Sequence, residues 1–280
     1  SRSPLQIGAE LFGHAGFDSD FEVISLMLES IQQASIEHPI TLDVGHAVIY
    51  RGLIEAAQLD STQVQELFPL MQAKAVADID KLLNRLNLAP SVRAMLSALP
   101  RLHGGIDVLS QAREDFAAAP TAVIASIDAL EQLAQTLAAR FPTVSQYFDL
   151  AELRGYQYHT GVVFSAMIPA FGQPLAKGGR YDDIGQVFGR ARPATGFSTD
   201  LKVLAELSRL EIESTRSIRL PAIDDLTTEQ QQALWHCQTE LRATGARLIT
   251  HMPSQVEDSG ELRYSQQLVW HDAGWHVDKL

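Results

Sequence analysis

The chain has 280 residues, of which 46% are hydrophobic, and a formal net charge of −12 from 22 basic and 34 acidic side chains. This apolar content supports a sizeable core and excludes a disordered chain. The acidic excess argues against nucleic acid as a partner, because neutralising phosphates needs a basic surface. The single cysteine, Cys237, excludes an internal disulfide and a multi-cysteine zinc site. No apolar run of the sequence reaches the ~20 residues of a membrane span, so we expect a soluble, cytoplasmic globular protein.

The N-terminal fifth of the chain predicts two strands with a helix between them. Alternating polar and apolar residues predict a strand over residues 4–12. Ser19 and Glu22 have the S-x-x-E spacing of a capping box, which predicts Ser19 as the N-cap of a helix. A β-branched, alternating stretch over residues 40–50 predicts the second strand.

A run of short amphipathic helices punctuated by prolines is predicted over about 52–142. Its Ala and Leu content suits a helical insertion between strands. Strand character returns over 148–168, a glycine-bearing loop is expected over 171–180, and a helix follows over 200–210. Strands grouped in this order, without regular βαβ alternation, predict an α+β fold with an antiparallel sheet.

Residues 216–280 predict a separate, small α/β unit. Thr227 and Gln230 have capping-box spacing at the start of a helix, and the last residues predict a hairpin with its turn at 272–274. We therefore expect two domains, one over residues 1–215 and a small C-terminal one over residues 216–280.

Three separated stretches carry most of the specific information. They are LQIGAELFG at 5–13, ELRGYQYHTGVVF at 152–164 and GGRYDDIGQVFGRARPATGF at 178–197. Together they resemble the catalytic domain of histidyl-tRNA synthetases, which carries Q-x-G-x-E-x-F-G, R-G-x-x-Y-Y-T-G and G-G-R-Y-D elements. The resemblance implies a class II aminoacyl-tRNA synthetase-like fold, an antiparallel sheet with a helical insertion.

The chain departs from the synthetase pattern at motif 3. Where the synthetases have Glu-Arg, this chain has Lys202 and Val203. The motif 3 arginine of class II synthetases holds nucleotide phosphates, and valine has neither the charge nor the donor for such a contact. The small C-terminal unit also carries no basic stripe for tRNA. Amino-acid adenylation and tRNA charging are therefore not expected.

The whole chain, including FGRARPATGFS at 188–198 and its last residues LVWHDAGWHVDKL, resembles the regulatory subunits of short-form ATP phosphoribosyltransferase. These proteins are histidyl-tRNA synthetase paralogues without aminoacylation activity. The resemblance implies a non-catalytic subunit in the first step of histidine biosynthesis, which activates a separate catalytic subunit. It also implies a dimer, feedback inhibition with L-histidine as effector, and no cofactor. The alternatives are a synthetase-like ligase that still activates an amino acid, and a bare scaffold with a vestigial pocket.

The same resemblance places residues 5–13 in the second half of motif 2. Motif 1, which makes the dimer interface in this fold, and the first strand of motif 2 would then lie upstream of Ser1. We therefore expect the chain to be truncated at its N-terminus, with an incomplete sheet that exposes an unpaired edge or a symmetric partner surface.

Six residues are expected to line a histidine-like ligand pocket, with no catalytic residue and no metal ligand among them. Two of them share a strand face about 13 Å apart, four residues at ~3.3 Å each, and are separated by Gly8. A carboxylate there can accept a hydrogen bond from an imidazole N–H or an ammonium. The alternative is an exposed strand face with ordinary polar residues. The six are Gln6 and Glu10 on this strand, and Arg154, Tyr158, His159 and Tyr181 from the other motifs.

Two of these positions carry specific alternatives. Arg154 matches a synthetase arginine near the amino-acid carboxylate, but it could instead form an ion pair with Glu152. His159 replaces a synthetase tyrosine and is shorter, with a charge that changes near pH ~6.5. Because a regular strand would put Arg154 and His159 on opposite faces, both can line one pocket only if the chain turns at Gly155.

The GGRYD element and the residues after it add structural expectations. Gly178–Gly179 allow close backbone approach, and Arg180 and Asp182 brace the fold rather than touch a ligand. Arg190 and Arg192 could face an anion, the acidic side of a partner, or solvent. The nine histidines form no metal-binding motif.

Overall fold

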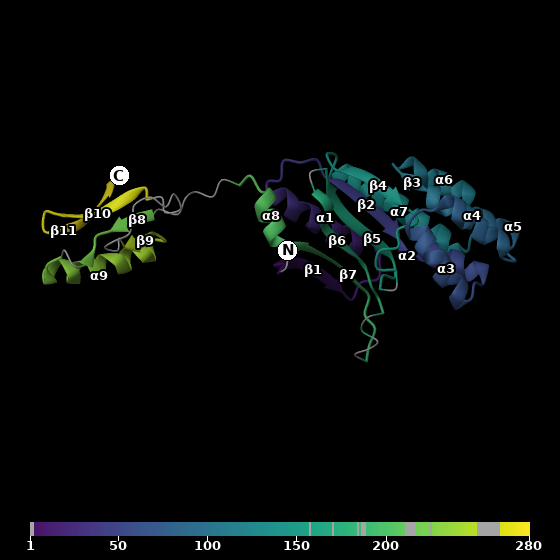
Figure 1. Cartoon of the computed structure of the whole chain (residues 1–280), viewed down its shortest axis with the longest axis horizontal. Helices are drawn as coiled ribbons and strands as arrows, with labels where there is room; N and C mark the ends of the chain where they lie inside the picture. The colour runs from purple at the N-terminus through teal and green to yellow at the C-terminus, as the bar shows by residue number, and fades with distance from the viewer. Residues whose placement is uncertain are drawn as a thin grey trace. The chain divides into compact units, whose positions relative to one another are not determined.

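The computed structural model of the chain describes residues 3–156, 158–169, 171–183, 185, 189–210, 217–223, 226–250 and 264–280. The chain divides into two compact units, Ser1–Arg209 and Leu210–Leu280 (Figure 1). Each unit encloses a hydrophobic core of its own. Among the described residues, no helix has both the length and the apolar character needed to cross a membrane.

The first unit is built on a seven-stranded sheet with the strand order β1-β7-β6-β5-β2-β4-β3. Neighbouring strands run antiparallel except β2 and β4, which run parallel because the helical insertion forms the crossover between them. This arrangement confirms the predicted α+β class with a mainly antiparallel sheet. The strands are β1 (Gln6–Phe12), β2 (Thr41–His46), β3 (His103–Gly104), β4 (Ser145–Asp149), β5 (Val162–Ile168), β6 (Phe171–Arg180) and β7 (Ala194–Asp200).

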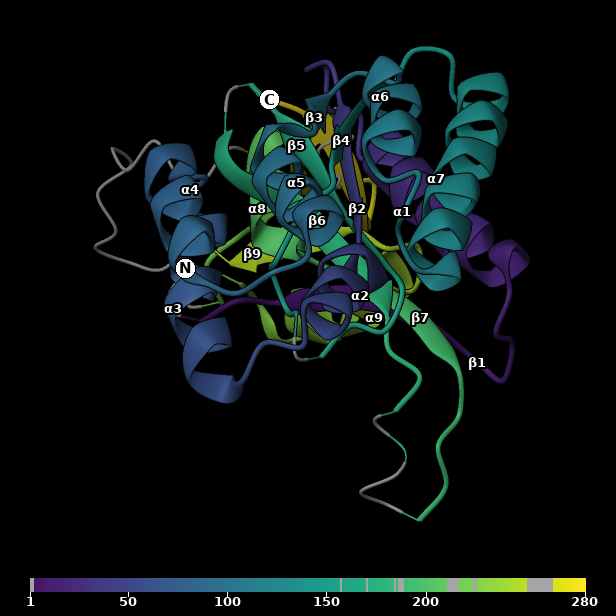
Figure 2. The same cartoon turned by 90° about the vertical axis from the view of Figure 1, so that its right-hand side faces the viewer.

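Two long helices, α1 and α7, pack against the sheet and against each other (Figure 2). Helix α1 contacts β5, β6 and β7, and α7 contacts β2. Five shorter helices stand between β2 and α7, and one follows β7. The helices are α1 (Phe17–Gln33), α2 (Ala47–Ala57), α3 (Ser61–Gln72), α4 (Val76–Arg85), α5 (Pro90–Ala98), α6 (Asp107–Asp115), α7 (Thr121–Arg140) and α8 (Leu201–Leu207).

The helical insertion begins earlier than its apolar periodicity indicated. Strand β2 ends at His46, whose Nδ1 accepts from the Val48 amide at 3.4 Å and so caps helix α2. The predicted strand over 40–50 is therefore correct up to His46 and wrong beyond it. β-Branched residues such as Val48 and Ile49 suit a strand, but they suit the core-facing side of a helix equally when it is buried, as Ile49 is.

Helix α1 also begins earlier than predicted, because its N-cap is Gly16 and not Ser19. The buried Ser19 hydroxyl lies inside the first turn and donates to the carbonyls of Gly16 and His14, at 2.8 and 3.0 Å. Asp18 and Asp20 place negative charge in this first turn, where the helix dipole favours it.

The glycine-bearing stretch 171–180 is strand β6 rather than the expected loop. A Cβ atom on Gly178 would lie 2.2 Å from the carbonyl oxygen of Gly196 and 2.6 Å from the ring of Phe164. The expectation that this glycine allows close backbone approach is thus confirmed. Glycine inside a strand marks such contacts, and it does not by itself interrupt the strand.

Where the structure describes it, the second unit has a four-stranded sheet with the order β11-β10-β8-β9 and one helix. Thr227 and Gln230 form the predicted capping box. Asp272 and Ala273, with φ of 49° and 59°, form the predicted hairpin turn, as a primed turn requires. The elements are β8 (Ser217–Leu220), α9 (Thr228–Ala243), β9 (Arg247–Thr250), β10 (Gln266–His271) and β11 (Gly274–Lys279).

Candidate functional site

A row of glycines crosses the sheet of the first unit. The strand register pairs Glu10 with Gly196, Gly196 with Gly179, Gly179 with Val163, and Val163 with Gly45. Residues paired in this way point to the same face, because side chains alternate along each strand. Three of the five positions therefore carry no side chain, which leaves space above the main chain for groups from other segments.

Three of the predicted pocket residues fill the space above two of these glycines. A Cβ atom on Gly196 would lie 2.8 Å from Cγ of Glu10 and 2.9 Å from the hydroxyl of Tyr181. A Cβ atom on Gly179 would lie 2.6 Å from Nδ1 of His159. Glycine at both positions is thus what allows these three side chains to gather on the sheet.

The ring of Tyr158 packs against two of these side chains. Its ring centroid lies 5.1 Å from that of Tyr181 and 5.2 Å from that of His159, and the residue is 49% exposed. We call Glu10, Tyr158, His159 and Tyr181 the Glu10 cluster. The structure therefore brings together four of the six residues predicted for the pocket.

The two phenols of the Glu10 cluster stay protonated. Burial raises the pKa of Tyr181 well above its usual range, and the nearby Glu10 carboxylate raises it further. Burial and the same carboxylate also raise the pKa of Tyr158. The Tyr181 hydroxyl is buried and faces the Glu10 carboxylate, which acts on it as a hydrogen-bonding neighbour, and it has no other partner among the described residues.

The imidazole of His159 is neutral in this setting. Burial lowers its pKa, while a hydrogen bond to the carbonyl of Arg180 and the charge of Glu152 partly oppose that shift. Nδ1 lies 3.3 Å from this carbonyl oxygen, which can only accept, so Nδ1 carries the proton and Nε2 is left as an acceptor. The cluster thus contains one carboxylate acceptor, Glu10, while Nε2 of His159 lies on the side of Gly155.

Arg154 and Gln6 make other contacts. The Nη2 of Arg154 donates to Asp43 at 2.7 Å, and its Nε donates to Glu152 at 2.7 Å. The ion pair with Glu152 that the sequence left as an alternative is therefore present. Gln6 is exposed at the other end of β1, opposite Asp200. That both residues line the ligand site is still a prediction.

The turn required at Gly155 is present. Gly155 has φ of 66°, a left-handed conformation that glycine adopts without strain. Its carbonyl accepts from the amides of Tyr158 and His159 at 2.7 and 2.8 Å. The turn folds the chain back so that His159 lies over Gly179, while Arg154 pairs with Asp43, which is two residues from Gly45 in β2 and therefore on the same face of the sheet.

Arg180 braces the fold, as expected. It is 6% exposed, and its Nη2 donates to Asp20 at 2.8 Å and to Ser19 at 2.6 Å. Its Nη1 donates to Asp182 at 3.2 Å. Burial raises the pKa of Asp20, against the opposing effects of Thr195 and Arg180. This network ties β6, which ends just before Tyr181, to the start of helix α1.

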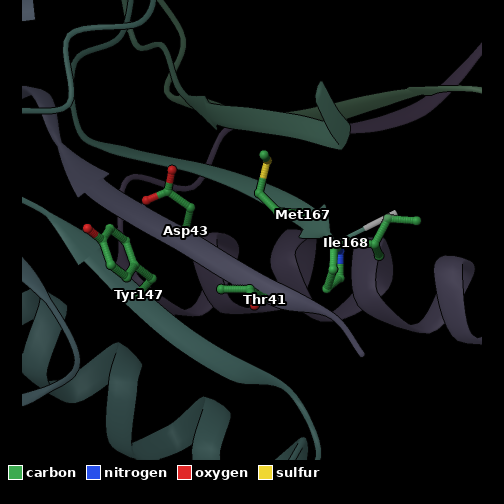
Figure 3. A pocket seen from close by; sticks show the side chains of 6 residues that line it. Thr41, Asp43, Tyr147, Met167 and Ile168 are labelled. Atoms are coloured by element: carbon green, nitrogen blue, oxygen red, sulfur yellow. The ribbon is translucent and has the colours of Figure 1, made fainter. Parts of the chain in front are cut away.

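Two hollows were not anticipated from the sequence. The first, of about 300 Å³, is lined by Asp43 and Tyr147 beside the apolar Met167 and Ile168 (Figure 3). Burial raises the pKa of Asp43, and its Oδ1 is buried without a hydrogen bond to a described residue. Only the alternation of polar and apolar residues around Asp43 in its strand hinted that this side chain faces away from the core.

The second hollow, of about 230 Å³, lies between the start of α1, helix α7 and the end of β2. Its charged and titratable lining consists of His46, Asp20 and Arg180, and Thr160 adds a hydroxyl. Burial, and to a lesser extent the charge of Arg180, lowers the pKa of His46 to about 4, so this imidazole is neutral. No short motif of the sequence connects these three residues.

Other candidate features show no site. Among the described residues, no three His, Cys, Asp or Glu side chains are grouped so that they could hold a metal ion. Arg190 and Arg192 are exposed. Their exposure is consistent with a solvated rim and assigns them no contact with a ligand.

Comparison with known families matches residues 1–204 to histidyl-tRNA synthetase and residues 216–278 to the ATP phosphoribosyltransferase subunit HisZ C-terminal domain. The fold and the site thus define a class II, histidyl-tRNA synthetase-like domain followed by a small second domain. The ATP phosphoribosyltransferase regulatory subunit of Pseudomonas syringae pv. tomato is 48% identical over all of this chain, which spans 69% of that protein. The chain belongs to the family of ATP phosphoribosyltransferase regulatory subunits.

Solved structures share the fold. An ATP phosphoribosyltransferase regulatory subunit/histidyl-tRNA synthetase from Bacillus halodurans has a TM-score of 0.72 and 25% identity, over 90% of this chain and 64% of that chain. A chain of an ATP phosphoribosyl transferase (HisG:HisZ) complex from Thermotoga maritima has a TM-score of 0.56 and 21% identity, over 70% of this chain and 66% of that chain. At these sequence identities, the structural similarity supports the assignment of the fold of this chain.

Proposed function

We propose that this chain joins the catalytic subunit of ATP phosphoribosyltransferase, raises its turnover, and takes part in histidine feedback inhibition without catalysing the reaction itself. The observation that carries the proposal is the family match, which extends over both units of the chain. The Thermotoga maritima complex contains both a HisG and a HisZ chain, which fits a two-subunit enzyme.

The residues at motif 3 support a non-catalytic role. Helix α8 begins after Asp200, whose side chain caps it by accepting from the amide of Lys202 at 3.1 Å. The Lys202 ammonium donates to the carbonyl of Ser3, and Val203 packs against the core of the first unit. Neither side chain offers the bidentate guanidinium with which an arginine holds phosphate oxygens.

The carboxylate of the Glu10 cluster supports histidine as the effector. The Glu10 carboxylate accepts hydrogen bonds, which an imidazole N–H or an ammonium donates. The Tyr181 hydroxyl, which faces Glu10, can donate or accept a hydrogen bond. Feedback requires that histidine bind two states of the assembly unequally, and coupling of ~1–3 kcal/mol suffices. Self-association as a dimer is part of this proposal.

The test mixes this protein with the purified catalytic subunit and follows ATP phosphoribosyl transfer. We expect no activity from this protein alone, a higher rate in the mixture, and inhibition of the mixture by histidine. An unchanged rate on mixing would contradict the proposal. Histidine-dependent exchange of pyrophosphate with ATP would instead support the rival synthetase-like ligase.

A further inference from the structure

Helix α2 holds the turn that carries half of the Glu10 cluster. The described residues of this turn are 153–156 and 158–161, and they include Tyr158 and His159. At its end, the carbonyl of Gly161 accepts from the first amide of α2, that of Ala47, at 2.9 Å. The helix therefore begins where the turn ends, and one of its sides faces the turn.

One turn further along the helix, Arg51 binds the main chain of the same segment. Its Nη2 donates to the carbonyl of Tyr156 at 3.2 Å and to the carbonyl of His159 at 2.9 Å. These two carbonyls lie three residues apart, so one nitrogen bridges both ends of the part that carries Tyr158. Hydrogen bonds from a charged donor are stronger than those from a neutral one.

Among the described carboxylates, none forms an ion pair with Arg51. This is informative, because the chain has 34 acidic side chains for 22 basic ones. The guanidinium is half-buried and contacts the ring of Tyr156, with Cζ 5.8 Å from the ring centroid. Its charge is thus directed at this turn rather than at a neighbouring acid.

The ring of Tyr156 fixes the turn from the other side. Its centroid lies 5.1 Å from that of Tyr50 on α2 and 5.6 Å from that of Phe68 on α3. Aromatic pairs at such distances add to the stability that burial provides. Both the main chain and one side chain of the turn are therefore attached to the helical insertion.

We propose that Arg51 is a positioning residue, which holds Tyr158 and His159 closed over the glycine row and thereby sets the affinity of the Glu10 cluster for its ligand. This inference rests on the proposed function for the ligand itself. It implies that a change in helix α2 reaches the cluster through two hydrogen bonds and one aromatic contact.

The experiment compares Arg51→Met with Arg85→Met in the full chain. Arg85 is a matched control, because it pairs with Glu66 on an exposed surface of α3 and α4. Hydrogen exchange of the amides of Tyr158 and His159, which donate to Gly155, reports opening of the turn. We expect about tenfold faster exchange in Arg51→Met, partial restoration in Arg51→Lys, and no change in Arg85→Met.

Calorimetry with free histidine adds the functional readout. We expect about tenfold weaker binding in Arg51→Met with partial recovery in Arg51→Lys, because an open turn must first be closed. Exchange in Arg51→Met that matches Arg85→Met would overturn the inference. If Arg51→Met does not fold, Arg51→Gln decides, because glutamine lacks the charged donor and wild-type exchange rates in it would equally overturn the inference. Absence of histidine binding in the wild type would refute the effector proposal. The exchange data would still test whether Arg51 holds the turn closed.

Discussion

At the scale of single residues, the Glu10 cluster depends on two glycines of the sheet, because glycine has no side chain to occupy the space above the strand. His159 lies on Gly179, and Glu10 and Tyr181 lie over Gly196, so any Cβ atom at either glycine would displace a cluster residue. Displacement at Gly179 cannot be relieved easily, because the carbonyl of Val162 would also lie 2.8 Å from the added atom. Glycine at both positions thus lets the cluster side chains lie directly on the main chain of the sheet.

Gly179→Ala tests this dependence. We expect it to destabilise the first unit by ~1–3 kcal/mol, as overpacking does, and to shift the NMR signals of the His159 ring. Gly172→Ala is the control in the same strand, because a Cβ atom there would meet no atom within 4 Å. Equal effects of the two substitutions on stability and on the ring signals would show that the His159 ring does not pack closely on Gly179.

Arg180 precedes Tyr181 and ties the end of β6 to helix α1. It is buried, and Arg180→Met would leave the half-buried Asp20 carboxylate without its ion pair. We expect a loss of ~3–5 kcal/mol in the free energy of unfolding, measured by urea titration. Arg85→Met, which removes an exposed ion pair, should cost less than about 1 kcal/mol. Similar losses in both variants would contradict a bracing role.

The sequence predicted those parts of the site that lie in continuous motifs. Glu10, Tyr158, His159 and Tyr181 each belong to a motif, and the structure gathers all four. Arg51 belongs to no motif. Its hydrogen-bond partners are main-chain carbonyls, which every residue type has, so no pattern of residue types could reveal its role. The pairing of Arg154 with Glu152 was an alternative that the sequence offered, but its second partner, Asp43, was beyond the sequence, because Asp43 is a neighbour only through the sheet.

At the scale of elements, helix α2 begins with an unusual cap. His46 accepts from the amide of Val48 through Nδ1, which requires the neutral imidazole. Burial lowers the pKa of His46 from an ordinary value of 6.5 to about 4. The unfolded chain therefore binds a proton near pH 6.5 that the folded chain does not bind. Stability from this group is complete above that pH and is lost as the pH falls towards 4.

His46→Asn isolates this effect, because asparagine caps helices but does not titrate. We expect the stability of the wild type to fall relative to that of the variant by up to about 3 kcal/mol between pH 7 and pH 4.5. Urea unfolding followed by circular dichroism at several pH values gives the difference. A difference that is independent of pH would show that His46 is not held neutral.

Element boundaries were the least predictable part of the fold. The α+β class and the position of the helical insertion followed from periodicity, which samples many residues. The end of β2 is set by the His46 ring, which caps α2 two residues further on, and the start of α1 is held by Arg180, which is distant in sequence. Strand β6 was mistaken for a loop because the contact that requires Gly178, the carbonyl of Gly196, belongs to another strand.

At the scale of the whole molecule, the two units have separate cores and should lose structure independently. Leu234 is 1% exposed in the second core, and Leu130 is 1% exposed in the first. We expect each Leu→Ala substitution to cost ~2–5 kcal/mol in its own unit only. Hydrogen exchange followed by mass spectrometry on peptides from each unit separates the two. Faster exchange in both units from either substitution would mean that the units unfold together.

The division into two units also separates the chromophores of the chain. All three tryptophans, Trp235, Trp270 and Trp275, belong to the second unit, whereas the phenols of the Glu10 cluster belong to the first. Tryptophan fluorescence therefore reports on the second unit, and tyrosine absorbance reports mainly on the first. An unlabelled sample can thus reveal by optical spectroscopy alone which unit a partner or an effector touches first.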